Sequence, residues 1–242
     1  MKLKLEDATL FTKAIELISE LVVEVRIKVN EFGLSIVAID PANVSMVSLK
    51  VPKSSFKEFE SGKEELGVNL ENLKKVLRRA GKNSELILEK NENSIIINIE
   101  DKIKRTFTLN LIEVEGEDKD FPSHLEYSSK VEMDPSSLSD SIEDCAIVGD
   151  SCSFKTIDGK FIVEAKETDS AKTEFSSDEI KIEGENSVSK YSLEYLQKFM
   201  KAGKSFDKVL LNFANDHPLK LDFKSKVVAL SFLLAPRIET ED

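Results

Sequence analysis

The sequence has few histidines and cysteines, two residue types from which many catalytic and metal sites are built. Its two histidines, His124 and His217, have no metal-ligand spacing to each other or to its two cysteines, Cys145 and Cys152. Neither cysteine has a CxxC partner, and the GxSxG, HExxH and GxGxxG patterns of common enzymes do not occur. We therefore expect no catalytic residue, no metal site and no cofactor.

Long apolar runs and excess positive charge are also absent. No segment approaches the ~18 to 20 uninterrupted apolar residues that a membrane-spanning helix needs, and the first ten residues contain no signal-peptide core. Together with the scarcity of cysteine, these absences predict a soluble cytoplasmic protein. A net charge of -11 argues against general affinity for nucleic acid, because lysine and arginine supply most non-specific phosphate binding.

The sequence does contain one unit twice. The segment LENLKKVLRRAGK at residues 70–82 returns, one residue shorter, as LEYLQKFMKAGK at residues 193–204. Upstream, residues 7–18 and 134–145 share the same apolar rhythm. The copies lie half a chain apart, which predicts two similar domains of about 110 to 120 residues each. The expected parts are residues 1–113 for the first domain, 114–129 for a connector and 130–242 for the second domain.

Hydrophobic periodicity predicts an α+β fold. Apolar residues recur at helical spacing in four short segments, residues 7–21, 71–80, 135–147 and 193–202. Most of the remaining sequence alternates at strand spacing, most clearly at residues 23–30, 44–51, 94–100, 105–112, 160–165 and 218–223. Each domain is therefore expected to have two helices packed on a curved antiparallel sheet.

Positive charge gathers on the second helix of each half. The basic residues are Lys74, Lys75, Arg78 and Arg79 in the first copy and Lys198, Lys201 and Lys204 in the second. A single charge run is usually only a solvated helix face. Its return at the corresponding helix of both halves, in an otherwise acidic chain, favours a surface that faces a polyanion.

Two other segments invite a functional interpretation. The AGKS segment at residues 202–205 closes a helix and lacks the upstream glycine of a phosphate-binding loop, which indicates a helix C-cap. Carboxylate pairs in the connector, such as Asp118 with Asp120, preorganise no metal geometry, so solvation is favoured. Phe121 stands out, because a large aromatic residue in an acidic linker must dock on a domain or bind a partner. We interpret Phe121 as docked.

Four segments together resemble one known family. AIDPANVSMVSL (residues 38–49), LGVNLENLKKVLRRAGK (66–82), DHPLKLDF (216–223) and FLLAPRIE (232–239) are similar to segments of archaeal and eukaryotic sliding clamps of the proliferating cell nuclear antigen type. The resemblance spans the whole chain. It implies a homotrimeric ring of six similar domains, without catalysis or cofactor, whose helices line a hole around duplex DNA.

The resemblance also implies site residues. Lys13, Lys75, Arg78 and Lys201 match positions that face DNA in similar clamps, and helical geometry adds Lys74, Arg79, Lys198 and Lys204. Client proteins of the family, namely DNA polymerase, clamp loader, flap endonuclease and DNA ligase, dock through short motifs. Their pocket would be formed by Ile39, Val44, Phe121, Pro122, Pro218, Leu233, Ala235 and Pro236, with Asn43 at its rim.

Ring closure in the family joins two strand edges. By this resemblance, strand 105–112 would pair with strand 171–177 of a neighbouring subunit. Both strands alternate polar and apolar residues, as two edge strands would if their main-chain groups pair with each other across subunits. The contact residues would be Phe107, Thr108, Leu109 and Phe175.

One helix departs from the family pattern, since Asp140, Glu143 and Asp144 stand where relatives usually carry Lys or Arg. The acids could pair with neighbouring lysines, the ring could use mainly its other helices, or the chain could be one subunit of a mixed trimer. The predicted function is a DNA polymerase processivity factor that encircles DNA, at the nucleoid of an archaeal cell or in a eukaryotic nucleus. The alternative is a non-replicative clamp-fold scaffold or a subunit of a heterotrimeric clamp.

Overall fold

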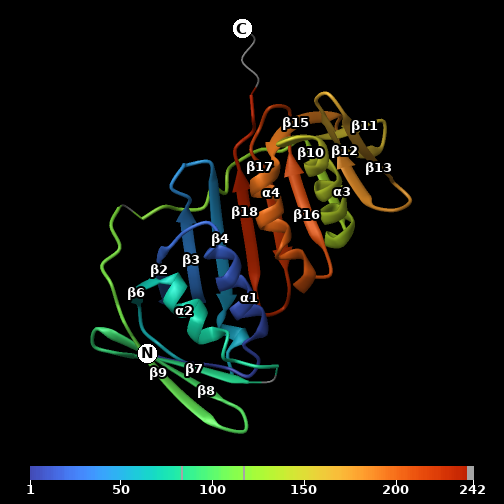
Figure 1. Ribbon diagram of the computed structural model, residues 1–242. Coiled ribbons are helices and arrows are strands. Elements are labelled where there is room, and N and C mark those ends of the chain that lie inside the picture. The colour runs from blue at the N-terminus through green and yellow to red at the C-terminus, as the bar shows by residue number, and fades with distance from the viewer. Residues whose placement is uncertain (83, 117, 239–242) are drawn as a thin grey trace. The chain divides into compact units, whose positions relative to one another are not determined.

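A computed structural model of the protein describes residues 1–82, 84–116 and 118–238, except for the side chain of Lys204 (Figure 1). The chain has two compact units. Unit 1 comprises Met1–Pro41, Val47–Phe121 and Ser225–Leu230, and unit 2 comprises Ala42–Met46, Pro122–Lys224 and Ser231–Asp242. The change of unit between Phe121 and Pro122 falls inside the segment that the sequence predicts as a connector.

The order of α-helices and strands is the same in the two halves, which differ in where their short 3₁₀ helix lies. The first half runs β1 (Lys2–Leu5), α1 (Thr9–Ile18), β2 (Glu24–Asn30), β3 (Gly33–Ile39), β4 (Ser45–Pro52), the short 3₁₀ helix η1 (Lys53–Ser55), β5 (Glu58–Glu60), β6 (Glu64–Asn69), α2 (Leu70–Leu77), β7 (Glu85–Asn91), β8 (Ser94–Glu100) and β9 (Lys104–Asn110). The second half runs β10 (Ser129–Met133), α3 (Pro135–Val148), β11 (Ser151–Ile157), β12 (Lys160–Lys166), β13 (Ser170–Ser176), β14 (Lys181–Gly184), β15 (Ser187–Ser192), α4 (Leu193–Met200), the 3₁₀ helix η2 (Gly203–Ser205), β16 (Val209–Phe213), β17 (Leu219–Lys224) and β18 (Ala229–Leu234). The predicted α+β fold with two similar domains is confirmed.

The strands of both units pair antiparallel. In unit 1 the strand order β5-β1-β7-β8-β9 forms one sheet, and β2 pairs with β3 and β6. In unit 2 the order β13-β12-β11-β15 forms one sheet, and β10 pairs with β14 and β16. Alternating residues of these strands are buried, as in β2, where Val25, Ile27 and Val29 are each at most 2% exposed. This period of two packs one face of each sheet into a core.

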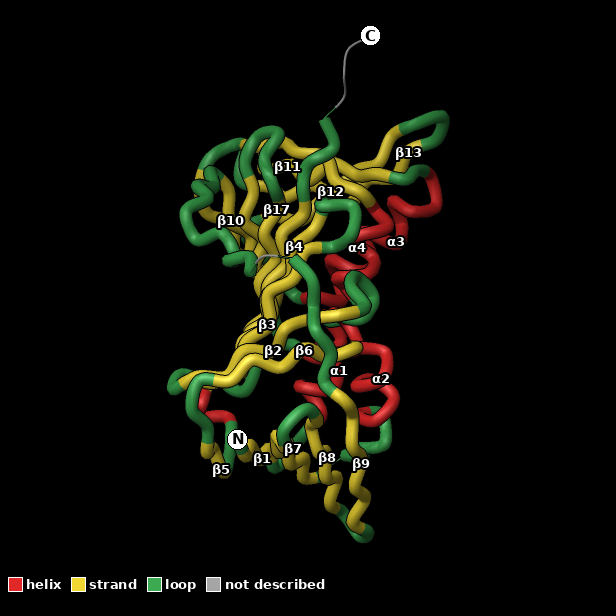
Figure 2. Tube along the Cα trace, turned by 90° about the vertical axis from the view of Figure 1, so that its left-hand side faces the viewer, coloured by secondary structure: helices red, strands yellow, loops and turns green. Residues whose placement is uncertain are grey.

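The helices of each unit pack against each other as pairs. Helices α1 and α2 are in contact in unit 1, and α3 and α4 are in contact in unit 2; Figure 2 shows the helices of each unit beside its yellow strands. Polar side chains cap the N-termini of two of these helices. At α2 the Asn69 side chain accepts a hydrogen bond from the Asn72 N–H, and at α3 the Asp134 side chain accepts one from the Ser137 N–H.

The predicted ends of α1, α2 and α4 lie two or three residues beyond the observed ones. In α2 the Arg79 N–H donates to the Val76 carbonyl and the Ala80 N–H to the Leu77 carbonyl, which is the tighter 3₁₀ pattern. The apolar spacing continues over this last tightened turn, so periodicity alone does not separate it from the helix.

Candidate nucleic-acid and peptide interfaces

A single carboxylate joins the basic residues of α1 and α2. Glu16 of α1 lies 2.8 Å from the Lys13 ammonium and 2.7 Å from the Arg78 Nε. Partial burial acts to raise the pKa of Glu16, but the hydrogen bonds from Lys13 and Arg78 outweigh it and hold that pKa below its ordinary value. The two cations remain about half exposed, at 52% and 58%, so an approaching anion can still contact them.

The four predicted cations of α2 differ in availability. Lys74 is only 12% exposed and forms an ion pair of 2.6 Å with Glu71. Lys75 and Arg79 are exposed, and neither side chain forms an ion pair with another described residue. The outward charge of this helix therefore comes mainly from Lys75, Arg78 and Arg79.

The basic residues at the end of α4 are arranged differently. Lys198 pairs with Glu194 at 2.7 Å and lies over the Tyr195 ring at 5.2 Å from its centroid. Lys201 caps the C-terminus of α4 and is exposed, a position where positive charge is favoured by the helix dipole. The predicted contribution of Lys204 falls on a side chain outside those that the structure describes.

Helix α3 presents an acidic face. Its buried side contains Leu138, Ile142 and Cys145, so Asp140, Glu143 and Asp144 point outward. The apolar side chain of Ile147 is also exposed, at 82%. None of the three acids forms an ion pair with any residue that the structure describes. Pairing with neighbouring lysines of the same chain, the first explanation of the acidic helix, is therefore not observed.

Most residues of the predicted peptide pocket belong to unit 2. The Ala235 N–H donates to the Val44 carbonyl at 2.9 Å, which places the segment around Val44 alongside the segment that follows β18. The described apolar members in this unit are all half-buried, namely Val44, Pro122, Pro218, Leu233, Ala235 and Pro236, while Asn43 is exposed with a φ of 57°. The two remaining members, Ile39 and Phe121, are half-buried residues of unit 1.

Tyr127 is a further candidate that the sequence analysis missed. Its ring contacts the ring of His217 edge-on, with the ring centroids 5.4 Å apart. His217 directly precedes Pro218, a member of the predicted pocket. Its hydroxyl is buried and has no hydrogen-bond partner among the described residues. Burial, with a smaller effect from the charge of Asp222, raises the pKa of Tyr127 to about 12, so the hydroxyl stays protonated and can donate. An aromatic residue near the end of the connector, two residues before β10, was the available signal.

The strands predicted to close a ring lie at sheet edges. In the described residues, β9 pairs only with β8 and β13 only with β12, so each has one side without a strand. Phe107 and Leu109 are half-buried and Thr108 is exposed. Phe175 stacks on the fully buried Phe161 at 6.1 Å, so it also belongs to the core of unit 2.

The described part of the chain offers no metal site beside these surfaces. Among the described residues, no group of three or more His, Cys, Asp and Glu side chains is placed to hold a metal ion. In the same residues no helix has the length and apolar character needed to cross a membrane.

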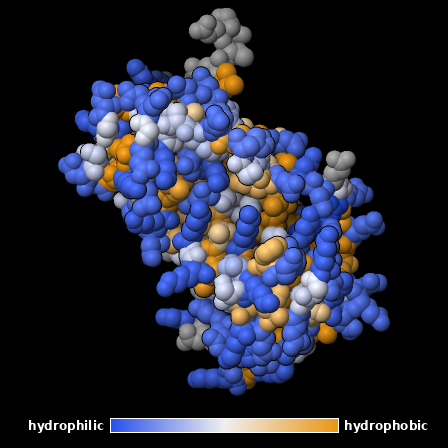
Figure 3. Space-filling view, turned by 180° about the vertical axis from the view of Figure 1, so that it is seen from behind, coloured by the Kyte–Doolittle hydropathy of each residue, from blue (hydrophilic) through white to orange (hydrophobic). Residues whose placement is uncertain are grey.

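The surface viewed in Figure 3 is mostly hydrophilic, with small hydrophobic groups between the charged side chains.

Comparisons with known proteins cover the whole chain. The family model for the proliferating cell nuclear antigen N-terminal domain matches residues 1–120, and that for the C-terminal domain matches residues 122–238. The DNA polymerase sliding clamp of Pyrococcus horikoshii is 34% identical over 97% of both chains. That of Methanothermobacter thermautotrophicus is 35% identical over 100% of this chain and 99% of the relative.

Solved structures agree in fold. A chain of the PCNA2-PCNA3 complex from Sulfolobus tokodaii superposes with a TM-score of 0.91 at 30% identity, covering 99% of this chain and 100% of that one. The proliferating cellular nuclear antigen of Entamoeba histolytica has the same TM-score at 24% identity over 98% of each chain, which supports the fold alone.

Proposed function

The chain belongs to the proliferating cell nuclear antigen family of DNA polymerase sliding clamps, and we propose that it works as a homotrimeric ring around duplex DNA. The observation that carries this proposal is the exposed positive charge of α1, α2 and α4 in a chain of net charge -11. A closed ring stays on DNA by linkage, so it needs only weak, salt-screened phosphate contacts. Lys13, Lys75, Arg78, Arg79 and Lys201 would supply them.

Ring closure would use β9 of one copy and β13 of the next. Each strand has an edge whose main-chain groups can pair with another chain. The two surfaces differ, so the contact is heterologous and closes only when the rotation between subunits suits the ring. Three copies with two domains each would then make six domains.

Client proteins would dock on the half-buried apolar side chains of unit 2 around Val44, Pro218 and Ala235, with Phe121 of the connector contributing an aromatic contact. Small clusters of this kind concentrate the binding energy of a short motif. The unpartnered Tyr127 hydroxyl would donate a hydrogen bond to the bound peptide. DNA polymerase, clamp loader, flap endonuclease and DNA ligase are the proposed clients, and the cytoplasm remains the predicted location.

Light scattering combined with a retention assay tests the ring. At micromolar concentration we expect a mass three times that of the 27.1 kDa chain. Once loaded, the protein should remain on nicked circular DNA and be lost when the circle is cut, and it should lengthen the products of a polymerase. Equal retention on circular and cut DNA would contradict topological binding.

A mixed ring is the second candidate. The unpaired acids of α3 favour it, because Asp140, Glu143 and Asp144 would place negative charge beside DNA three times in a homotrimer. A neighbouring chain of different sequence would dilute that repulsion. A monomeric mass in light scattering, together with extension activity only after a second clamp chain is added, would replace the homotrimer with this assembly.

A further inference from the structure

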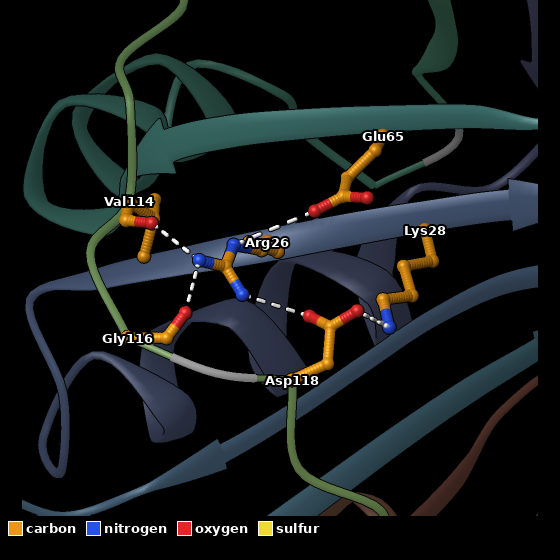
Figure 4. Close-up of polar contacts among 6 residues, drawn as sticks. All are labelled: Arg26, Lys28, Glu65, Val114, Gly116 and Asp118. Atoms are coloured by element: carbon orange, nitrogen blue, oxygen red, sulfur yellow. Dashed lines mark hydrogen bonds and ion pairs between the residues drawn. The ribbon is translucent and has the colours of Figure 1, made fainter.

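Arg26 makes most of the side-chain contacts that hold the connector to the rest of unit 1. Arg26 of β2 donates from Nη2 to the Val114 and Gly116 carbonyls, both at 2.5 Å, and from Nη1 to the Asp118 carboxylate at 2.8 Å (Figure 4). Its Nε lies 3.4 Å from a Glu65 oxygen. One guanidinium thus spans a strand residue, two connector carbonyls and a connector carboxylate.

We call Arg26, Asp118 and the Val114 and Gly116 carbonyls the Arg26 cluster. Outside this cluster, the described residues of the connector form few polar contacts with the rest of the chain. Lys28 reaches the other oxygen of Asp118 at 2.6 Å. Within the described residues 114–126, every side-chain hydrogen bond and ion pair to the rest of the chain is made by Arg26 or Lys28. The neighbouring anchors lie outside this stretch, at the Ile112 N–H, which donates to the Gly67 carbonyl, and at the Ser128 hydroxyl, which contacts Ser187.

Phe121 lies within short reach of the cluster. It follows Asp118 by three residues, and three residues span at most about 11 Å when fully extended. Fixing the Asp118 carboxylate therefore restricts where the Phe121 ring can lie. Without the cluster, the chain would be unrestrained by polar contacts over more than ten residues, and an aromatic anchor would be ordered only when a peptide binds.

We propose that Arg26 is a positioning residue for peptide docking, holding the first part of the connector so that Phe121 is ordered before a client arrives. This inference rests on the proposed function, because it assumes that client peptides contact Phe121. Arg26 would act through Asp118 and the two carbonyls without itself touching the peptide.

The chemistry of arginine fits this role. Its planar fork carries five N–H donors, so it can serve two carbonyls and a carboxylate together, whereas a lysine ammonium is a single point. Hydrogen bonds from Lys28 and then Arg26 hold the pKa of Asp118 below its usual range, so the carboxylate stays charged at neutral pH. With Arg26 23% exposed and Asp118 50% exposed, salt will weaken the contact.

A single-tryptophan variant can measure the position of the connector directly. The sequence contains no tryptophan, so Phe121→Trp introduces one reporter, whose fluorescence anisotropy follows local mobility. We expect Arg26→Gln in this background to lower the anisotropy, with Arg26→Lys in between. Lys50→Gln is the matched control, because it removes one charge from an exposed β4 residue that has no side-chain partner among the described residues.

Peptide binding is measured separately, without the tryptophan, using a fluorescein-labelled synthetic peptide that carries one leucine and two phenylalanine anchors. If the connector becomes disordered in most molecules, the apparent Kd rises by the inverse of the ordered fraction, which for Arg26→Gln we expect to be about threefold to tenfold. The melting temperature should change little. Added salt should weaken binding by the unmutated chain more than by Arg26→Gln.

The outcomes separate this inference from the function on which it rests. A wild-type chain that does not bind the peptide contradicts the proposed docking surface, while the anisotropy still decides whether Arg26 orders the connector. Unchanged anisotropy in Arg26→Gln overturns the inference, and so does lowered anisotropy with an unchanged Kd. An equal loss of affinity in Lys50→Gln would show a general charge effect and also overturn it.

Discussion

At the scale of single residues, charge and availability are separate properties on helix α2. Lys74 and Lys75 are neighbours in the sequence, yet Lys74 is 12% exposed and paired with Glu71, while Lys75 is exposed and pairs with no described residue. A lysine that must leave a short ion pair to reach a phosphate gains less from the new contact. The two lysines therefore form a natural comparison.

We predict that Lys75→Ala weakens DNA binding and Lys74→Ala hardly changes it. Each phosphate contact contributes counterion release, so losing Lys75 should make the slope of log binding constant against log salt shallower by about one unit. Titration of a short duplex over a salt series measures both slopes. Equal slopes for the two variants would contradict the assignment of the outward charge to Lys75.

A glycine permits the close approach of the backbone at Ile112, just before the connector, to β6. A Cβ on Gly67 would lie 2.0 Å from the Ile112 carbonyl oxygen, whereas a Cβ on Gly62 would meet nothing within 4 Å. Both glycines lie near β6, but only Gly67 has another chain segment against it.

We predict that Gly67→Ala destabilises the protein by about 1 to 3 kcal/mol, since the backbone at Ile112 must shift to admit a methyl group. Gly62→Ala should stay within about 0.5 kcal/mol of the parent. Urea unfolding of the three proteins gives the comparison. If Gly67→Ala is as stable as Gly62→Ala, the backbone at Ile112 can shift without loss of stability, which would contradict this account.

At the scale of elements, α3 and α2 have similar buried faces and opposite outer faces. Leu138, Ile142 and Cys145 pack α3 into unit 2 much as Leu70, Leu73 and Leu77 pack α2 into unit 1. Because burial decides only one side of a helix, the outer side is free to differ in charge. The acidic face of α3 is therefore a feature of this element and places no demand on the fold.

Neutralising that face with Asp140→Asn, Glu143→Gln and Asp144→Asn should tighten DNA binding. Three charges near 10 Å from a phosphate in water contribute roughly 0.4 kcal/mol each, which corresponds to about an eightfold gain at low salt. The gain should shrink as salt rises, because screening removes the repulsion. Retention on nicked circles at two salt concentrations measures the effect.

The control removes the same charge elsewhere. Glu24, Glu31 and Glu92 are exposed acids of β2 and of two hairpin turns, and changing each of them to Gln matches the change in net charge. If both triple variants bind DNA equally well, net charge alone explains the result and α3 has no special place in binding.

At the scale of the whole molecule, the proposed ring would assemble through two different strand edges, those of β9 and β13. In a heterologous contact, one surface of a chain binds a different surface of its neighbour. A substitution can therefore disrupt one of the two surfaces and leave the other intact. Leu109 lies on β9 and Ala171 on β13, and both are half-buried beside an open edge. An aspartate at either place would put an unpaired charge into the contact.

We predict that Leu109→Asp and Ala171→Asp each give a monomer, and that mixing the two restores one intact contact. Light scattering of the mixture should then show a mass twice that of the 27.1 kDa chain, and thermal melting should show that both variants remain folded. A mixture that stays monomeric, or a trimer formed by either variant alone, would place the subunit contact on other strands.

Much of the architecture could be predicted, and much of the site geometry could not. The duplicated segment at residues 70–82 and 193–204 predicted the repeated order of elements that the structure has. The partners of Lys74, the edge-on contact of Tyr127 with His217 and the reach of Arg26 to Asp118 were missed. Arg26 and Asp118 are 92 positions apart, and no local pattern encodes such a pair.

The sequence by itself determined the family, the two similar domains and the identity of the basic and acidic helices, because apolar spacing and repeated segments are local properties of the chain. Only the tertiary structure decided which charges are available and what holds the connector. Those depend on exposure and on distances between residues remote in sequence, as between Glu16 and Arg78. Packing brings such side chains together, and short-range Coulomb and hydrogen-bond energies then select their partners.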